Sequence, residues 1–209
     1  MEKAQWKKLS GKSSVEKAQW KKPSRKSMTK PMNSSSGVSV QNGAVKTGHR
    51  AFRNYLLLAL AIVIADQAAK ALAIHNLADP PPIDLLPILS LVLVFNSGAA
   101  FGFLNQAGGW QTLMFSVVAL LVSAVLVHQM YKIAATQRQA ALAFALILGG
   151  AIGNLIDRLG AGVVTDYILF HYGDWQFPAF NIADIAITIG AALLIMDAIG
   201  WRVFKEKKA

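Results

Sequence analysis

The stretch WQTLMFSVVALLVSAVLV, residues 110–127, contains no charged side chain. An α-helix rises about 1.5 Å per residue, so about 20 apolar residues cross the hydrocarbon core of a bilayer. This stretch belongs to an apolar segment at about 110–131, and similar segments occur at about 52–75, 140–157 and 180–201. The pattern predicts an all-α membrane protein with four transmembrane helices.

The composition agrees with a membrane protein. The 209 residues are 54% hydrophobic and only 15% charged, and the mean hydropathy is +0.41. A soluble protein would carry about a quarter charged residues. The chain has no cysteine, which excludes disulfides, thiolate catalysis and Cys-ligated metals.

The formal charge of +10 is confined to the N-terminal segment. Residues 1–50 hold 12 of the 21 Lys and Arg residues and 2 of the 11 acidic residues, so the remainder of the chain is neutral. A neutral apolar body argues against nucleic acid as a partner. We expect 1–50 to be a disordered basic cytoplasmic tail, 51–204 to be the membrane domain, and 205–209 to be a short basic cytoplasmic end.

The tail contains a duplication, because EKAQWKK occurs at residues 2–8 and again at 16–22. Two copies are too few for a repeat architecture. The tail could anchor the chain electrostatically to anionic lipids, or it could be a dispensable extension. We favour the second interpretation.

Charge asymmetry predicts the orientation. Four spans place both ends on one side, together with the basic loop at 132–138, so the positive-inside rule predicts cytoplasmic termini. The connections at about 76–109 and 158–179 then face outward. Their apolar runs at 89–95, 99–104 and 163–170, with turn-like residues at 96–98 and 171–174, predict a small β-sheet on the outer, periplasmic face. Pro80, Pro81, Pro82 and Pro87 disfavour helix before that sheet.

Ionisable side chains gather toward the outer end of the predicted spans. Asp66 and Lys70 are spaced to pair on one helix face, and Asp197, far from this group, is expected near Arg202 at a helix end. Charges within a span are costly and mark functional sites by default. The gathering contains four carboxylates, two amides and two cations: Asp66, Lys70, Asn154, Asp157, Arg158, Asp166, Asn181 and Asp184.

Paired carboxylates are the chemistry that fits this gathering. No Ser-His-Asp arrangement is apparent, and the HExxH metal motif is absent. Two adjacent aspartates can share one proton, so that one activates water and the other polarises a carbonyl oxygen. Aspartic peptidase chemistry follows, although residue spacing does not decide which two aspartates form the pair.

Five sequence blocks occur in an order that resembles the bacterial lipoprotein signal peptidase (signal peptidase II) family. The resemblance covers about residues 52–204, and the aromatic Tyr167 keeps the character expected after Asp166. The blocks are DQAAK at 66–70, NSGAAF at 96–101, GGAIGNLIDR at 149–158, VTDY at 164–167 and FPAFNIAD at 177–184.

The resemblance assigns roles that spacing leaves open. It implies that Asp166 and Asp184 are the catalytic pair. It implies a substrate-binding lining of Asn96, Asn154, Arg158 and Asn181. It implies supporting roles for Asp66, Lys70 and Asp157, and a tight turn at Gly98.

The implied substrate is a prolipoprotein whose cysteine already carries a diacylglyceryl group. Cleavage would occur just before that cysteine, without a metal or organic cofactor. The implied location is the bacterial inner membrane, with the active site toward the periplasmic face. We expect contact with membrane lipids and action as a monomer.

Two alternatives predict different patterns. A proton- or ion-coupled transporter subunit would carry ionisable groups through both halves of the membrane, or an inverted repeat. A noncatalytic membrane scaffold gives no reason for an aspartate on each side of a Pro-containing outer segment. The clustering at one face favours the peptidase.

Overall fold

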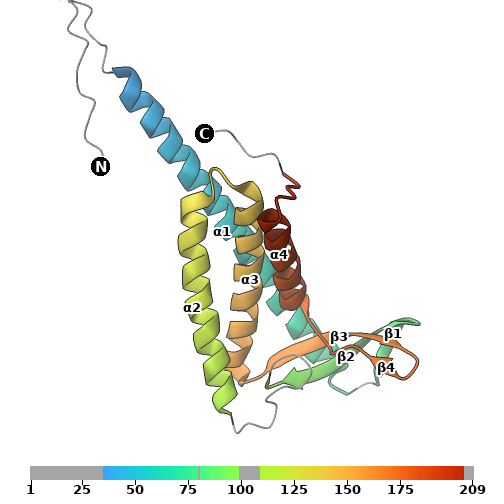
Figure 1. Cartoon of the computed structure of the whole chain (residues 1–209). Helices are drawn as coiled ribbons and strands as arrows, with labels where there is room; N and C mark the ends of the chain where they lie inside the picture. The colour runs from blue at the N-terminus through green and yellow to red at the C-terminus, as the bar shows by residue number, and fades with distance from the viewer. Residues whose placement is uncertain (1–34, 80, 99–108, 205–209) are drawn as a thin grey trace, which may run out of the picture.

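The computed structural model describes residues 35–79, 81–98 and 109–204, with side chains described from residue 48 onward. Figure 1 shows the helices side by side, with a small sheet at one end of the bundle. The helices are α1 (Ser35–Leu77), α2 (Trp110–Ile133), α3 (Arg138–Ala161) and α4 (Ile182–Ala198). The strands are β1 (Ile83–Leu86), β2 (Leu89–Asn96), β3 (Val164–Tyr172) and β4 (Trp175–Gln176).

Three helices are long and apolar enough to cross a membrane within the described ranges. They are Gly48–Leu77 of α1, together with α2 and α3. Helix α4 is highly apolar but has only 17 residues, so its assignment as a fourth span stays a prediction. The α2–α3 connection and the C-terminal end of α4 lie at the end of the bundle opposite the sheet (Figure 1).

Helix α1 begins earlier than the sequence suggests. Residues 35–50, which composition predicts to be disordered, are helical and continuous with the apolar segment. Extending an existing helix adds one hydrogen bond per residue and avoids the cost of nucleation. The rest of the tail, with its duplication, and residues 205–209 lie outside the described residues.

The sheet contains both strands expected at 89–95 and 163–170, and two further short strands. Its order is β1-β2-β3-β4, and all neighbouring pairs are antiparallel. Strand β3 continues to Tyr172 because the turn to β4 lies at Gly173, whose φ of 57° suits glycine. The strand expected at 99–104 lies outside the described residues.

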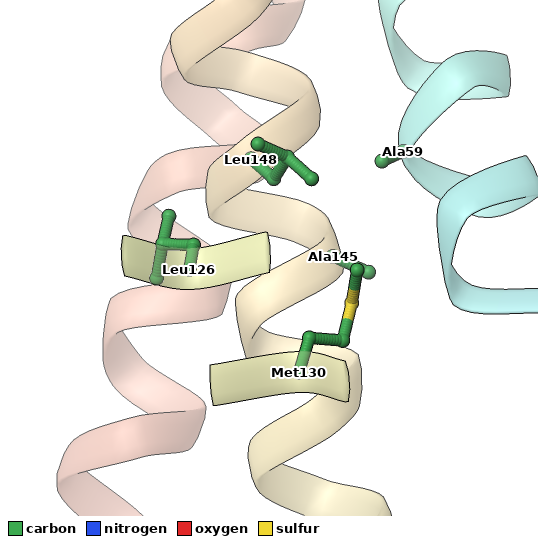
Figure 2. Packing of buried hydrophobic residues seen from close by; sticks show 5 residues of the cluster. All are labelled: Ala59, Leu126, Met130, Ala145 and Leu148. Atoms are coloured by element: carbon green, nitrogen blue, oxygen red, sulfur yellow. The ribbon is translucent and has the colours of Figure 1, made fainter. Parts of the chain in front are cut away.

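The bundle is held by close packing of α3 against its neighbours. Figure 2 shows Met130 and Leu126 of α2 beside Ala145 and Leu148 of α3, with Ala59 of α1 closing the cluster. These residues are all buried.

Glycines let α3 approach α1 closely, as the spacing of Gly149 and Gly153 predicts. A Cβ atom at Gly149 would lie 2.9 Å from the carbonyl oxygen of Ala59. A Cβ atom at Gly153 would lie 2.6 Å from Oδ2 of Asp66. The α1–α3 contact therefore brings Asp66 against the polar end of α3.

Candidate active site

Strand β3 and the start of α4 are joined through Phe180. The backbone N–H of Ile168 donates to the Phe180 carbonyl at 2.9 Å, and the Phe180 N–H donates back to Ile168 at 3.0 Å. This pairing fixes the segment before α4 alongside β3. Asp166 on β3 and Asp184 in the first turn of α4 are thereby brought to one place.

Asp166 is held by two amides. Asn181 Nδ2 donates to its Oδ1 at 2.7 Å, and Asn96 Nδ2 donates to its Oδ2 at 3.1 Å. Asn96 is itself oriented, because its Oδ1 accepts from the Gly98 N–H at 3.0 Å. Asp166 is buried, and its carboxylate therefore has a fixed direction.

Asp184 is fixed by a helix cap. The Asn181 side chain accepts from the Asp184 N–H at 3.0 Å, and Asp184 Oδ2 accepts from the Asn181 N–H at 3.2 Å. This reciprocal capping box holds the first turn of α4. The other oxygen, Oδ1, accepts from Asn154 Nδ2 at 2.9 Å.

Two asparagines connect the carboxylates. Asn181 Nδ2, which donates to Asp166, also lies 3.2 Å from Asn154 Oδ1, and Asn154 donates to Asp184. A continuous chain of amide hydrogen bonds thus runs from one aspartate to the other. Both amides belong to the substrate-binding set predicted from the resemblance, and their geometry places them between the two carboxylates.

Lys70 belongs to a buried cluster next to Asn154. Its Nζ is 2.8 Å from Asp66 Oδ2 and 3.0 Å from Asp157 Oδ2. It also donates to Asn154 Oδ1 at 2.9 Å. The predicted pairing of Asp66 with Lys70 is confirmed, and Asp157 is a second partner that spacing alone does not identify. Asp197 lies apart, 3.9 Å from Arg202, as expected.

A cavity of about 680 Å³ opens onto both aspartates. Its lining includes Asn96, Asn154 and Arg158, as the resemblance implies, whereas Asn181 is fully buried and is not among the described lining residues. The rest of its lining is mostly apolar, with aromatic residues from the β3–β4 hairpin and its continuation and aliphatic residues from α4. The apolar lining includes Phe170, Trp175, Phe177, Phe180, Ile185 and Ile189.

Arg158 is half-buried and lines the cavity. Its Nη1 is 3.4 Å from the Asn154 carbonyl oxygen, and its guanidinium lies 5.3 Å from the centre of the Phe115 ring. Arginine carries five N–H donors, and the hydrogen bond found among the described residues uses one of them. Within the described ranges, no three His or acidic side chains are grouped as ligands for a metal ion.

Burial raises the pKa of the Asp166 carboxyl to about 6. The hydrogen bond from Asn96 opposes this rise, and the negative charge of Asp184 adds to it. A carboxyl with such a pKa exchanges its proton near neutral pH. General acid–base catalysis is most effective under that condition.

Comparison with known proteins adds independent information. The family model described as "Signal peptidase (SPase) II" matches residues 58–200. The chain belongs to the signal peptidase II family. A lipoprotein signal peptidase from Pseudoalteromonas translucida is 44% identical over 155 residues, covering 74% of this chain and 93% of that protein. One from Escherichia fergusonii is 45% identical over 154 residues, with the same coverage.

Solved structures agree with this assignment. Two structures of a bacterial membrane enzyme, determined by the in meso method at 2.3 and 1.9 Å resolution, are each 30% identical to the chain. Their TM-scores are 0.59 and 0.60. The matches cover 75% and 70% of this chain and 94% and 92% of the solved chains. Membership of the signal peptidase II family and three apolar helices together fit an inner-membrane protein.

Sequence reasoning missed Gln67 in this signal peptidase II chain. Its Nε2 lies 2.9 Å from Asp157 Oδ1, 3.1 Å from the Gly153 carbonyl and 3.3 Å from Asp66 Oδ2. Gln67 therefore links the two acidic partners of Lys70. Its position beside Asp66 in the DQAAK block is a signal, but its partners lie on α3 and are not visible from helical spacing.

Ser90, His171 and Asp84 lie close together in the sheet, but they do not form a catalytic triad. Ser90 Oγ lies 2.5 Å from Asp84 Oδ1 and 2.7 Å from His171 Nε2. Pairing of β1 with β2 and of β2 with β3 brings these three side chains together, although His171 lies far from the other two in the sequence. The aspartate contacts the serine rather than the histidine, so the order of a catalytic triad is not formed. The three side chains instead tie β1, β2 and β3 together.

Proposed function

We propose that the chain is an aspartic endopeptidase that removes signal peptides from prolipoproteins, with Asp166 and Asp184 as the catalytic pair. One observation carries the choice of pair: both carboxylates line a single cavity and are connected by the amides of Asn181 and Asn154. Family membership and relatives named lipoprotein signal peptidase support the activity. Neither supports a transporter subunit.

In the proposed reaction, the pair holds one proton. The ionised carboxylate takes a proton from a water molecule in the cavity, and the oxygen attacks the scissile carbonyl carbon. The protonated carboxyl donates a hydrogen bond to the carbonyl oxygen as negative charge develops there. Proton transfer to the leaving nitrogen then breaks the C–N bond and restores the pair. The mechanism uses no metal or organic cofactor.

The other polar residues of the cavity would position the substrate. Arg158, which lines the cavity, would donate to peptide carbonyls, and Asn96 and Asn154 orient the carboxylates. Gly98 lies beside Asn96 and supports its orientation. The substrate we propose carries a diacylglyceryl group on the cysteine that follows the cleaved bond. The apolar cavity wall and the exposed side chains of Ile185 and Ile189 suit such a lipidated chain.

We further propose that α4 is a fourth span and that the termini face the cytoplasm. The 17 residues of α4 would extend about 26 Å, close to the thickness of the hydrocarbon core. Basic residues at the α2–α3 connection support a cytoplasmic location for that end. The cavity and sheet would then lie toward the periplasm, in contact with lipid, and a monomer contains both carboxylates.

The test uses purified protein and a prolipoprotein precursor, with and without the diacylglyceryl group. We expect mass spectrometry to show cleavage immediately before the cysteine of the lipidated precursor and little cleavage of the unmodified one. The Gln139→Leu variant serves as a folded control, because this residue lies at the opposite end of the bundle and contacts Leu193 and Trp201. Cleavage at another bond, or equal cleavage of both precursors, contradicts the proposed substrate.

A further inference from the structure

We infer that Lys70 is a positioning residue of this active site, because its ammonium group joins two carboxylates that each hold the backbone next to a catalytic aspartate. The inference rests on the proposed catalytic pair and deepens it. It assigns a specific task to a buried cation that does not line the cavity. The contacts of the two arms, one through Asp66 and one through Asp157, carry the inference.

The first arm reaches α4. Lys70 Nζ pairs with Asp66 Oδ2 at 2.8 Å, and Asp66 Oδ1 accepts from the Ala183 backbone N–H at 2.9 Å. Ala183 directly precedes Asp184 and is fully buried. The position of the first turn of α4 thus depends on a carboxylate that Lys70 holds in place.

The second arm reaches β3. Lys70 Nζ pairs with Asp157 Oδ2 at 3.0 Å, and the same oxygen accepts from the Thr165 backbone N–H at 3.0 Å. Thr165 directly precedes Asp166 and is buried. Each residue immediately before a catalytic aspartate is therefore anchored to one of the two carboxylates around a single ammonium group.

The third contact of Lys70 orients an amide. Its donation to Asn154 Oδ1 at 2.9 Å leaves Nδ2 of that amide to donate to Asp184 Oδ1. An ammonium group has three donors, and here all three have partners. Lys70 is only 2% exposed. Removing one partner of a buried ion pair is strongly destabilising, so the test of Lys70 must separate positioning from stability.

Lys70→Met tests the inference because it keeps an unbranched side chain and removes the charge. Asp66 and Asp157 would then face each other without a cation, and the anchors of Ala183 and Thr165 would shift. We expect kcat to fall about 100-fold, as for a displacement of about 1 Å at a catalytic group. KM should change much less, because the cavity lining is retained.

A pH profile separates positioning from stability. The groups that face Lys70 are Asp66 on α1, Asp157 on α3, Asp166 on β3 and Asp184 on α4. The positive charge of Lys70 lowers the pKa of Asp166. In Lys70→Met, the alkaline limb of kcat/KM should therefore move to higher pH. A variant that is only destabilised would not show this shift.

Asp157→Asn is the second variant, since it removes a charge but keeps an oxygen that can accept from Thr165. We expect a smaller loss of kcat than in Lys70→Met. Gln139→Leu is the matched control: its side chain is 3% exposed and bridges α3 to Leu193, Trp201 and Val203 far from the cavity. It should lower the thermal midpoint and leave kcat and the pH profile unchanged.

Three outcomes would overturn the inference. One is a wild-type kcat in folded Lys70→Met, and another is an equal loss of kcat in Gln139→Leu. The third is failure of both Lys70→Met and Asp157→Asn to fold while the control folds, which would show a role in stability alone. Retained cleavage in Asp166→Asn or Asp184→Asn would instead contradict the proposed catalytic pair, so the two failures are distinguishable.

Discussion

The environment of Asp166 raises the pKa of its carboxyl group toward neutral pH. The side chain is buried, yet two amides donate to its oxygens. Burial disfavours the charged form, and the hydrogen bonds favour it. Because the first effect is larger, the pKa of Asp166 rises from 3.8 to about 6.

This pKa predicts the alkaline limb of the pH profile. If the pair must hold one proton, kcat/KM should fall as the pH rises above about 6, by about tenfold for each unit. The value of kcat/KM falls because a rise in pH removes the proton that the pair needs to donate a hydrogen bond to the carbonyl oxygen. A steady-state profile from pH 5 to 9 checks this expectation, and a rate that increases steadily to pH 9 contradicts it.

Replacing Asn96 should shift the alkaline limb of the kcat/KM profile. Asn96→Ala removes a donor to Asp166 and should raise its pKa further, shifting the limb upward by about one pH unit. Asn76→Ala is a matched control, because that amide donates to the Leu72 carbonyl at an exposed part of α1. An unchanged limb in Asn96→Ala would show that Asp166 is not the group that titrates.

At the residue scale, the sequence predicts which side chains gather and that Asp66 pairs with Lys70, but it does not predict the contacts of Asp166 and Asp184. Depth along each helix placed Asp66, Asp157 and Asp184 at similar levels. The contacts of Asp166 depend on β3 pairing with Phe180, and such a register is not encoded in helical spacing. For the same reason, the choice of catalytic pair required a resemblance to a known family.

At the scale of elements, the approach of α3 to α4 depends on Gly150. A Cβ atom there would contact the Ala183 carbonyl oxygen and Ile187. Gly150→Ala should therefore lower the free energy of unfolding by about 1–3 kcal/mol, because backbone must move. It should also reduce activity, since Ala183 precedes Asp184. Thermal unfolding in detergent and kcat measure the two effects.

Gly160 is the matched control on the same helix, since a Cβ atom there would meet nothing within 4 Å. Gly160→Ala should be neutral or stabilising by up to about 1 kcal/mol, because alanine has the higher helix propensity. Equal destabilisation by both substitutions would show that the effect of Gly150→Ala does not come from the α3–α4 contact.

The elements themselves were largely predictable, because apolar length and β-branched runs are local signals. Helices α2 and α3 and strands β2 and β3 agree with expectation to within a few residues. Strand β1 was not predicted, because it is only four exposed residues following three prolines. The start of α1 at Ser35 was also not predicted. The polar residues before the apolar segment are helical because they extend an existing helix, which needs no new nucleation.

At the scale of the whole molecule, orientation can be tested because the chain has no native cysteine. Thr136→Cys places a thiol in the α2–α3 connection, and Asp174→Cys places one in the turn between β3 and β4. In intact spheroplasts, a membrane-impermeant maleimide should label Asp174→Cys and should label Thr136→Cys only after permeabilisation. The reverse pattern contradicts cytoplasmic termini.

The basic tail offers a second test at this scale. A chain that starts at Thr47 retains the apolar part of α1, from Gly48 to Leu77, and every residue of the cavity. We expect it to cleave the lipidated precursor at the wild-type rate in detergent. A loss of more than about tenfold would show that the tail contributes directly to activity.

Single-turnover cleavage shows whether Asp166 and Asp184 are the reacting carboxylates. Asp166→Asn and Asp184→Asn keep the size of each side chain and remove only the ionisable group. We expect each variant to fold, as judged by circular dichroism, and to cleave the lipidated precursor at least about 1,000-fold more slowly than the wild type. Cleavage within tenfold of the wild-type rate by either folded variant would contradict the pair.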